Sequence, residues 1–515
     1  MTCRLTSEVR FPMAHGRDAP PMIQASVPDR MRKTIELART AQADWAAMSV
    51  RRRCRWLSVF RAWLASHSRQ ICETIDREVG KPREECLASE IHPLASGCAH
   101  LSRIAPEILA PRRARGTPWY LAGGSDHVHR RPRGVVGIIG TWNYPLVLSG
   151  TQIAQALVAG NAVIFKPSEK APETCRLLAD GIAGSGLPRG LIQLLDAEIA
   201  AGEELVNSSV DYVVFTGSRA VGARIASALA PRLVSSTLEL SGHDALFLLP
   251  GGNPIAAARA AWFGTIANSG RTCLATRRCL LDSSLMIPFR DEIARLILDV
   301  PPLELAKPAG FQERIDHAKS LAMEAVSMGA RWLGNSPDKP PFVVGNVNER
   351  MRIWREDCFA PLLAMMECAD ERSMIEADLA CPFALGAAVF GSPGPAKSFL
   401  TKLRAGMVTV NDVLVGAGHP DTPIGGSGSS GWGATQGAEG LLEMTVHQVV
   451  RVSHGSFRPH YELAVPGHPD MGDMLEALLQ AGHAGGLRAR IVAAMTLPGH
   501  ALRWWRSRQK RQGEV

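Results

Sequence analysis

Cys273 lies in the stretch NSGRTCLA, residues 268–275, and its thiol offers the most reactive chemistry in that stretch. A cysteine thiolate is a soft, strong nucleophile that can form a covalent adduct with a carbonyl carbon. The sequence has eleven cysteines, however, and a free cysteine is commonly a small buried residue without reactivity. From its own stretch alone, Cys273 can be either a nucleophile or a core residue.

Two other stretches have the residue types of a nucleotide site. FTGSRAVG, residues 215–222, follows an apolar strand and opens a helix, so its backbone N–H groups and the Ser218 hydroxyl can meet a pyrophosphate. KPSE, residues 166–169, follows the strand NAVIF, and Glu169 there can accept both ribose hydroxyls and repel a 2′-phosphate. In isolation, the first stretch is equally typical of a helix cap and the second of a solvated charge pair.

A literal GxGxxG motif spans Gly426 to Gly431. Neither a strand before it, nor a helix after it, nor an acid about 20 residues further on supports a dinucleotide site there. We interpret it as a loop that needs unusual backbone angles.

Alternating strands and helices must position these residues. The stretch from Arg133 to Lys166 has no charged residue between its ends, but polar residues and glycines break it, so we predict a buried strand–turn–helix–strand unit instead of a membrane span. Residues 28–110 have helical apolar spacing, and strands and helices alternate from 134 to about 412. The predicted fold class is α/β, with mostly parallel sheets covered on both faces.

Composition excludes several classes of protein. With 515 residues, 46% of them hydrophobic and 21% charged, the chain is globular and long enough for two or three domains. The odd, scattered cysteines argue against a disulfide framework or a metal site and favour a reducing, cytoplasmic location, and no secretory signal is visible. Of the net charge of +8, +6 falls in the last 28 residues, so the nearly neutral body gives no indication of nucleic-acid binding.

The motifs become specific through their joint order. They are TWNYP at 141–145, KPSE at 166–169, FTGSRAVG at 215–222, LELSG at 238–242, NSGRTCLA at 268–275, REDCFAP at 355–361, VND at 410–412 and PIGGSGSSGWG at 423–433. In this order they resemble the aldehyde dehydrogenase superfamily over roughly residues 28–455.

The resemblance implies three domains and a homodimer. We expect a Rossmann-like NAD-binding domain (28–115 and 134–240), a catalytic α/β domain (241–440) and a small β oligomerisation arm (116–133 and 444–455). The arm would give the dimer, since an unpaired edge strand invites a partner. Residues 456–515 form a basic extension beyond the usual end of the family.

The resemblance also implies a covalent mechanism. Cys273 would attack an aldehyde, Asn143 and the Cys273 backbone N–H would hold the oxyanion, and Glu239 would activate the water that hydrolyses the thioester. The implied cofactor-binding residues are Trp142, Lys166, Ser168, Glu169, Gly217, Ser218, Val221, Asp357 and Phe359. Glu239 favours hydrolysis over acyl transfer to coenzyme A, and Glu169 favours NAD over NADP.

Some positions depart from the family pattern. Ser241 and Ala360 replace glycines, and Ile424 replaces a common aromatic residue, which indicates an altered substrate pocket. Asp357 replaces a glutamate, so its shorter side chain or that of Glu356 would have to reach the nicotinamide ribose. The alternatives are a coenzyme A-acylating dehydrogenase and a catalytically idle binding protein. The sequence leaves the substrate open.

The tail combines apolar residues, the Trp504–Trp505 pair and clustered cations, a composition typical of a segment at a membrane interface. Docking on the protein's own surface is the preferred interpretation, and peripheral membrane contact is the alternative. Pro498 and Gly499 predict that the stretch from 487 to 511 is not one helix.

Overall fold

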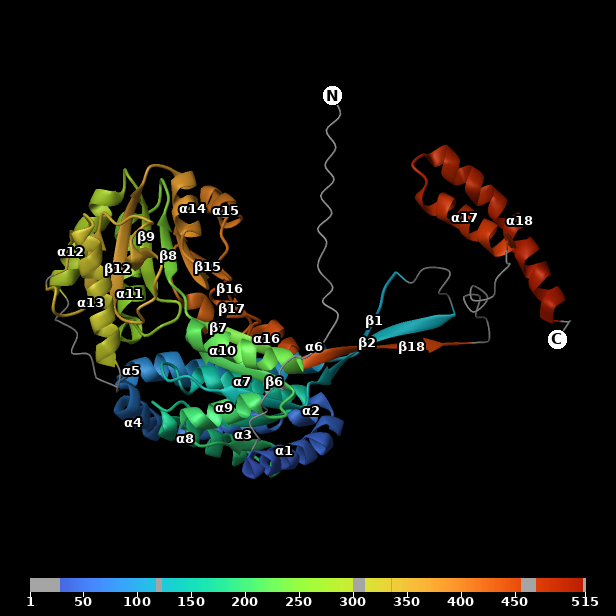
Figure 1. Cartoon of the computed structure of the whole chain (residues 1–515), viewed down its shortest axis with the longest axis horizontal. Helices are drawn as coiled ribbons and strands as arrows, with labels where there is room; N and C mark the ends of the chain where they lie inside the picture. The colour runs from blue at the N-terminus through green and yellow to red at the C-terminus, as the bar shows by residue number, and fades with distance from the viewer. Residues whose placement is uncertain (1–27, 117–122, 300–310, 335, 455–468, 513–515) are drawn as a thin grey trace, which may run out of the picture. The chain divides into compact units, whose positions relative to one another are not determined.

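The computed structural model describes residues 28–116, 123–299, 311–334, 336–454 and 469–512 (Figure 1). The chain divides into two compact units. The first holds the described residues of 28–111 and 129–448, and the second those of 112–128 and 449–512.

The first unit begins with the helices predicted for residues 28–110. They are α1 (Asp29–Ala47), α2 (Val50–Arg53), α3 (Trp56–Ser66), α4 (Ser68–Val79), α5 (Arg83–Cys86), the π-helical turn η1 (Leu87–Ile91) and α6 (His92–Ile108). Helix α4 illustrates why they form: Ile71, Ile75 and Val79 repeat every four residues and are buried. Gly80, with φ 66°, ends that helix in the left-handed conformation that glycine adopts without strain.

A six-stranded sheet follows in the order β17-β7-β6-β3-β4-β5. Its strands are β3 (Val135–Ile139), β4 (Ala162–Lys166), β5 (Ile192–Leu194), β6 (Tyr212–Gly217), β7 (Ser235–Leu240) and β17 (Gly431–Trp432), and only β17 is antiparallel to its neighbour. The strand order reverses at β3, and such a reversal opens a ligand crevice at the carboxyl ends of the strands.

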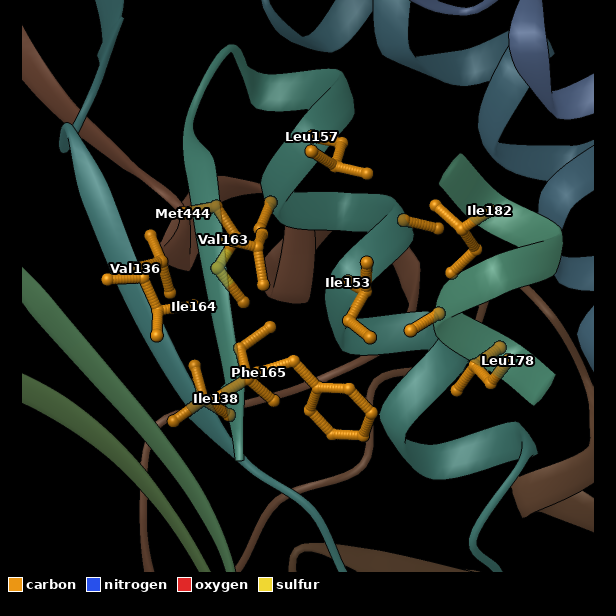
Figure 2. Packing of buried hydrophobic residues seen from close by; sticks show 14 of the residues in the cluster. Val136, Ile138, Ile153, Leu157, Val163, Ile164, Phe165, Leu178, Ile182 and Met444 are labelled. Carbon is orange, nitrogen blue, oxygen red and sulfur yellow. The ribbon is translucent and has the colours of Figure 1, made fainter. Parts of the chain in front are cut away.

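Helices α7 (Val147–Ala159), α8 (Pro172–Ala183), α9 (Ile199–Asn207), α10 (Arg219–Leu229) and the turn η3 (Ala230–Arg232) connect these strands. Figure 2 shows the core that α7 and α8 form with β3 and β4. Its labelled residues include Val136, Ile138, Ile153, Leu157, Val163, Phe165, Leu178 and Ile182. Strands β3 and β4 are buried along their whole length, which confirms the buried strand–turn–helix–strand unit predicted between residues 133 and 166.

A seven-stranded sheet has the order β10-β11-β12-β9-β8-β14-β15. Its strands are β8 (Asp244–Leu248), β9 (Thr276–Asp282), β10 (Arg331–Trp332), β11 (Phe342–Gly345), β12 (Leu362–Cys368), β14 (Gly386–Phe390) and β15 (Met407–Val410). All neighbours are parallel except β10 and β11. The predicted α/β fold class is therefore confirmed.

Helices cover both faces of this second sheet. One face packs on α11 (Pro254–Ile266) and α12 (Met286–Asp299), and the other on α13 (Phe311–Ser327), α14 (Glu371–Leu379) and α15 (Pro393–Leu400). The shorter elements of the first unit are η4 (Ala267–Gly270), η5 (Arg352–Trp354), β13 (Phe383–Ala384), η6 (Val415–Gly418), β16 (Ser427–Gly428) and α16 (Gly437–Glu443). Gly428 and Gly431 have φ of 61° and 96°, as expected for a loop with unusual backbone angles.

A third sheet joins β1 (Arg112–Arg113), β2 (Gly124–Pro132) and β18 (Thr445–Ser453) in the order β1-β2-β18. Within the second unit, the Arg451 guanidinium and the Asp126 carboxylate form an ion pair of 2.7 Å. The same unit contains α17 (Pro469–His483) and α18 (Leu487–Gln512).

The prediction that Pro498 and Gly499 divide the tail is wrong, since α18 runs through both residues. A proline inside a helix removes one backbone hydrogen bond, a loss that packing can offset. Trp504 of α18 supplies such packing, because it is buried with Met471 and Met474 of α17. No helix in the described part of the chain is long and apolar enough to cross a membrane.

Candidate active site

A cavity of about 1360 Å³ opens in the first unit where β3, β4, β6 and β7 end. Its volume exceeds the roughly 300–1,000 Å³ that is usual for sites of single small molecules. Every residue predicted for the site lines this cavity except Asp357. The structure therefore brings the candidate nucleophile, base and cofactor-binding residues to one place.

Cys273 reaches the cavity through a constrained turn between α11 and β9. Asn268, Ser269 and Gly270 are left-handed in succession, with φ of 50°, 54° and 71°. A Cβ atom at Gly270 would collide with the backbone of Ala360 and Pro361, so the turn requires glycine. Among the ten cysteines in the described segments, only Cys273 is not buried.

The surroundings of the Cys273 thiol disfavour its ionised form, the thiolate. Burial raises the pKa of the thiol to about 12, and the carboxylates of Glu239 and Asp244 act in the same direction. The backbone N–H groups of Leu274 and Cys273 oppose this effect and lower the pKa. The thiol must therefore lose its proton to a base as it reacts.

Asn143 lies in the turn after β3. Its Nδ2 donates to the Arg271 carbonyl oxygen at 2.9 Å, and its Oδ1 accepts from the Thr141 hydroxyl at 2.7 Å. A side-chain amide carries two hydrogens, and the contact with Arg271 uses one of them. The second remains for a ligand oxygen in the cavity that Asn143 lines.

A buried ion pair that the sequence analysis missed positions this turn. Lys81 Nζ lies 2.7 Å from Glu90 Oε1, with both side chains fully buried, and it donates to the Asn143 carbonyl oxygen at 3.1 Å. Glu90 Oε2 accepts from the N–H groups of Leu146 and Val147 at 3.1 and 2.9 Å, at the start of α7. In the sequence, nothing distinguishes these two charges from the solvated ones on neighbouring helices.

Glu239 is the penultimate residue of β7, in a buried, hydrogen-bonded position. Its Oε2 accepts from Gln152 Nε2 at 3.3 Å and from the Thr216 hydroxyl at 3.2 Å, and its Oε1 accepts from the Thr435 hydroxyl. Burial raises the pKa of Glu239 from 4.5 to about 7, against these hydrogen bonds, which lower it. A carboxylate with this pKa suits proton abstraction near neutral pH.

The predicted ribose and phosphate residues surround the ends of β4 and β6. Lys166 Nζ lies 3.4 Å from Glu169 Oε2; the Lys166 side chain is 5% exposed and that of Glu169 47%. Ser218 caps α10, since its hydroxyl accepts from Val221 N at 3.4 Å, and Gly217 precedes it at the end of β6. Carboxylate, ammonium and helix N-terminus together fit the hydroxyls and phosphates of a dinucleotide.

Trp142 and Phe359 form an aromatic wall of the cavity, with ring centroids 5.9 Å apart. Two cations that the sequence analysis missed lie on this wall. Lys170 Nζ is 5.0 Å from the Trp142 ring centroid, and the Arg314 guanidinium is 5.3 Å from that of Phe359. Such contacts fix the rings and bring positive charge next to them.

Asp357, which was predicted to contact a nicotinamide ribose, lies in the turn before Phe359. Its Oδ1 accepts from Phe359 N at 3.0 Å and lies 3.9 Å from Arg277 Nε, and it does not line the cavity. The short Asp357 side chain therefore forms a hydrogen bond within its own turn and lies near the buried Arg277 guanidinium. Glu356 pairs with the Arg352 guanidinium at 2.9 Å and does not line the cavity either.

Comparison with known sequences agrees with this geometry. The model of the aldehyde dehydrogenase family matches residues 21–450. A 4,4'-diapolycopene aldehyde oxidase of Methylomonas is 32% identical over 432 residues, which cover 82% of this chain and 81% of that protein. A candidate succinate-semialdehyde dehydrogenase (NADP(+)) of Mycobacterium ulcerans is 29% identical and covers 80% and 82%.

Solved structures share the fold. The NAD-dependent aldehyde dehydrogenase of Sinorhizobium meliloti superposes with a TM-score of 0.77 at 26% identity, covering 84% of this chain and 88% of that one. A Mycobacterium tuberculosis aldehyde dehydrogenase complexed with NAD+ gives a TM-score of 0.75 at 25% identity, with 82% and 90% covered. With a matching family model over most of its length and these residues in one cavity, the chain belongs to the aldehyde dehydrogenase family.

Proposed function

We propose that the protein oxidises an aldehyde to a carboxylic acid with NAD, through a thioester on Cys273 that water hydrolyses. One observation carries this proposal: Cys273, Asn143 and Glu239 line a single cavity together with residues suited to a dinucleotide. Each of the three has the chemical character that its step requires.

The first step is addition of the thiolate to the aldehyde carbon. Burial raises the pKa of the Cys273 thiol to about 12, so the thiol gives its proton to water in the cavity as the carbon–sulfur bond forms. The second amide hydrogen of Asn143 and the Cys273 N–H hold the oxygen of the thiohemiacetal as its negative charge develops. A dinucleotide held by the residues at the ends of β4 and β6 would supply the acceptor for the hydride that leaves the adduct carbon.

The second step releases the acid. Glu239 accepts a proton from water as that water attacks the thioester carbon, and the carbon–sulfur bond then breaks. The carboxylic acid leaves, and the sulfur recovers its proton. In sum, one aldehyde, one NAD+ and one water give one acid, one NADH and one proton.

NAD is the proposed cofactor because Glu169 lines the cavity as a half-exposed carboxylate, where a 2′-phosphate would be repelled. The NADP in the names of several relatives makes NADP the alternative. Acyl transfer to coenzyme A is the alternative for the second step, and the buried base Glu239 argues against it.

Substitution of the nucleophile tests the proposal. Cys273→Ala should abolish NADH formation from any aldehyde and leave the thermal unfolding midpoint unchanged, since only the thiolate forms the adduct. Cys54→Ala, which removes a buried thiol outside the cavity, should keep its activity. Substantial turnover by Cys273→Ala would refute the mechanism, and turnover by wild type only with coenzyme A would identify the acylating alternative.

A homodimer through the third sheet is also proposed. Strand β18 is at an edge of that sheet, and its Val449 and Val452 are 61% and 46% exposed. An exposed, apolar edge strand readily pairs with a second chain.

We further propose that α18 attaches the protein peripherally to anionic membranes. Five apolar residues follow one face of this helix and are 47–77% exposed: Leu487, Ile491, Met495, Leu502 and Trp505, here called the apolar stripe. Exposed arginines accompany the stripe: Arg488, Arg490, Arg503 and Arg506. A tryptophan and aliphatic side chains between cations are typical of a helix that lies in the headgroup region.

A further inference from the structure

The cavity has two kinds of wall. Its cationic lining residues in the described segments are Lys166, Lys170, Arg224 and Arg314. Lys166 ends β4 and Lys170 follows that strand, Arg224 lies on α10, and Arg314 contacts the rings of Trp142 and Phe359. All four therefore belong to the wall assigned to the cofactor.

The remaining wall is apolar. It comes from residues 85–93, the first turns of α7, the end of α11 and the segment after residue 412. Its large side chains are Val147, Leu148, Phe263, Ile266, Leu414 and Val415. Phe263 and Val415 are 55% and 58% exposed, so this apolar wall continues to the protein surface.

Charge on the apolar wall excludes a class of substrates. Besides the base Glu239, its charged lining residue in the described segments is Glu85, an acid. Arg271 is close in sequence to Cys273 but does not line the cavity, and its guanidinium donates to the carbonyl oxygens of Val79 and Asn268. A carboxylate on the substrate would lose its water, find no cation and meet Glu85.

We infer that the substrate is an uncharged aldehyde with a long apolar chain, and that short anionic semialdehydes are rejected. This inference rests on the proposed function and specifies the substrate class of the same site. Because the apolar wall lines the same cavity as Cys273 and continues to the surface, it accommodates a long chain whose end reaches solvent. The gain per buried methylene then makes chain length the main determinant of efficiency.

A series of aldehydes tests the substrate class. Unbranched alkanals of four to twelve carbons should show kcat/KM rising by up to about fourfold per methylene until the wall ends. Succinate semialdehyde should be oxidised less efficiently than butanal, which has the same chain length without the charge. A flat series, or a preference for succinate semialdehyde, would overturn the inference.

Leu148→Arg places a cation on the apolar wall. It should lower kcat/KM for decanal by tenfold or more and raise it for succinate semialdehyde. Leu379→Arg is the matched control, because Leu379 is 52% exposed and does not line the cavity. Its kcat/KM for decanal and for succinate semialdehyde should both equal those of wild type. If Leu148→Arg lowers both efficiencies equally, the wall does not contact the chain and the inference fails.

Binding without turnover separates the substrate class from the chemistry. Titration calorimetry of Cys273→Ala should detect binding of decanal and no binding of succinate semialdehyde. This result would support the proposed substrate class even if Leu148→Arg does not fold. Binding of succinate semialdehyde without binding of decanal would refute it. Absence of NAD-linked or NADP-linked oxidation of every aldehyde by wild type would instead refute the proposed function.

Discussion

At the scale of single residues, burial raises the pKa of both the nucleophile and the base. The values of about 12 for Cys273 and about 7 for Glu239 mean that the carboxylate, and not the thiolate, carries charge at neutral pH. Glu239 holds this charge through hydrogen bonds from Gln152, Thr216 and Thr435. The residue that must accept a proton from the hydrolytic water is therefore ionised near neutral pH.

Glu239→Gln should stop the reaction after the first turnover. The amide cannot take a proton from water, so NADH should appear as a burst and the steady rate should fall by about 10²–10⁴-fold. Rapid mixing measures the burst, and mass spectrometry detects the thioester on Cys273. If instead no burst forms, Glu239 is also indispensable for generating the thiolate.

The same carboxylate sets the pH dependence of wild type. Its raised pKa means that Glu239 is protonated below about pH 7, so steady turnover should fall about tenfold per pH unit there and level off above it. A profile whose midpoint lies near the ordinary value of 4.5 would contradict the assignment.

Glu169→Ser should relax the choice between cofactors. Removal of the carboxylate deletes the repulsion of a 2′-phosphate, so kcat/KM for NADP should rise relative to that for NAD by about tenfold or more. Glu173→Ser is the matched control, since Glu173 is exposed on α8 and does not line the cavity. An unchanged ratio in Glu169→Ser would show that the ribose is recognised elsewhere.

The order of the motifs along the sequence predicted most residues of the candidate site. Each chemical step requires a particular side chain, and that side chain lies near the end of a strand or helix. The exceptions depend on distant parts of the chain. Thr435 reaches Glu239 across 196 residues, and Lys81 reaches Asn143 across 62. The contacts of Asp357 with Phe359 and Arg277 likewise exist only in the folded chain.

At the scale of elements, the α7 N-terminus depends on Glu90, which accepts two of its N–H groups and pairs with Lys81. The buried strands were predictable because they are continuous apolar runs. The continuity of α18 was not predictable from the sequence. Pro498 locally disfavours a helix, and the packing of Trp504 against α17, which offsets this cost, exists only in the folded chain.

Lys81→Met should destabilise the protein more than the double variant Lys81→Met/Glu90→Gln. Removing one partner leaves a buried charge unpaired, which costs about 3–5 kcal/mol, whereas glutamine stays neutral and still accepts from the α7 N–H groups. Urea unfolding midpoints compare the two variants. Equal midpoints would show that the pair is not a buried, coupled unit.

Val449→Pro should dissociate the dimer. Proline removes an N–H group and fits poorly into a paired strand, so β18 should no longer pair with a second chain. Val449→Thr, which keeps the branched shape, is the control. Light scattering after gel filtration gives the mass, and a wild-type monomer or a dimeric Val449→Pro would contradict assembly through β18.

At the scale of the whole molecule, two apolar surfaces bear on the proposed substrate and its location. One wall of the cavity is apolar up to the surface, and so is one face of α18. The formal charge is concentrated in the tail, next to the apolar stripe. An apolar substrate partitions into membranes, so an enzyme for such a substrate gains from residence at the membrane surface.

The apolar stripe should bind anionic vesicles. Full-length protein should sediment with vesicles of 70% phosphatidylcholine and 30% phosphatidylglycerol at low salt and be released at high salt, since each cation near the surface contributes about 1 kcal/mol. Ile491→Glu/Leu502→Glu should abolish binding, because it puts two acids into the stripe. The control Leu233→Glu/Leu379→Glu adds the same charge at exposed positions outside α18 and should still bind. Equal sedimentation of both double variants would refute attachment through α18. If wild type binds no vesicles and only the stripe variant changes its mass in solution, the stripe is a contact between protein surfaces.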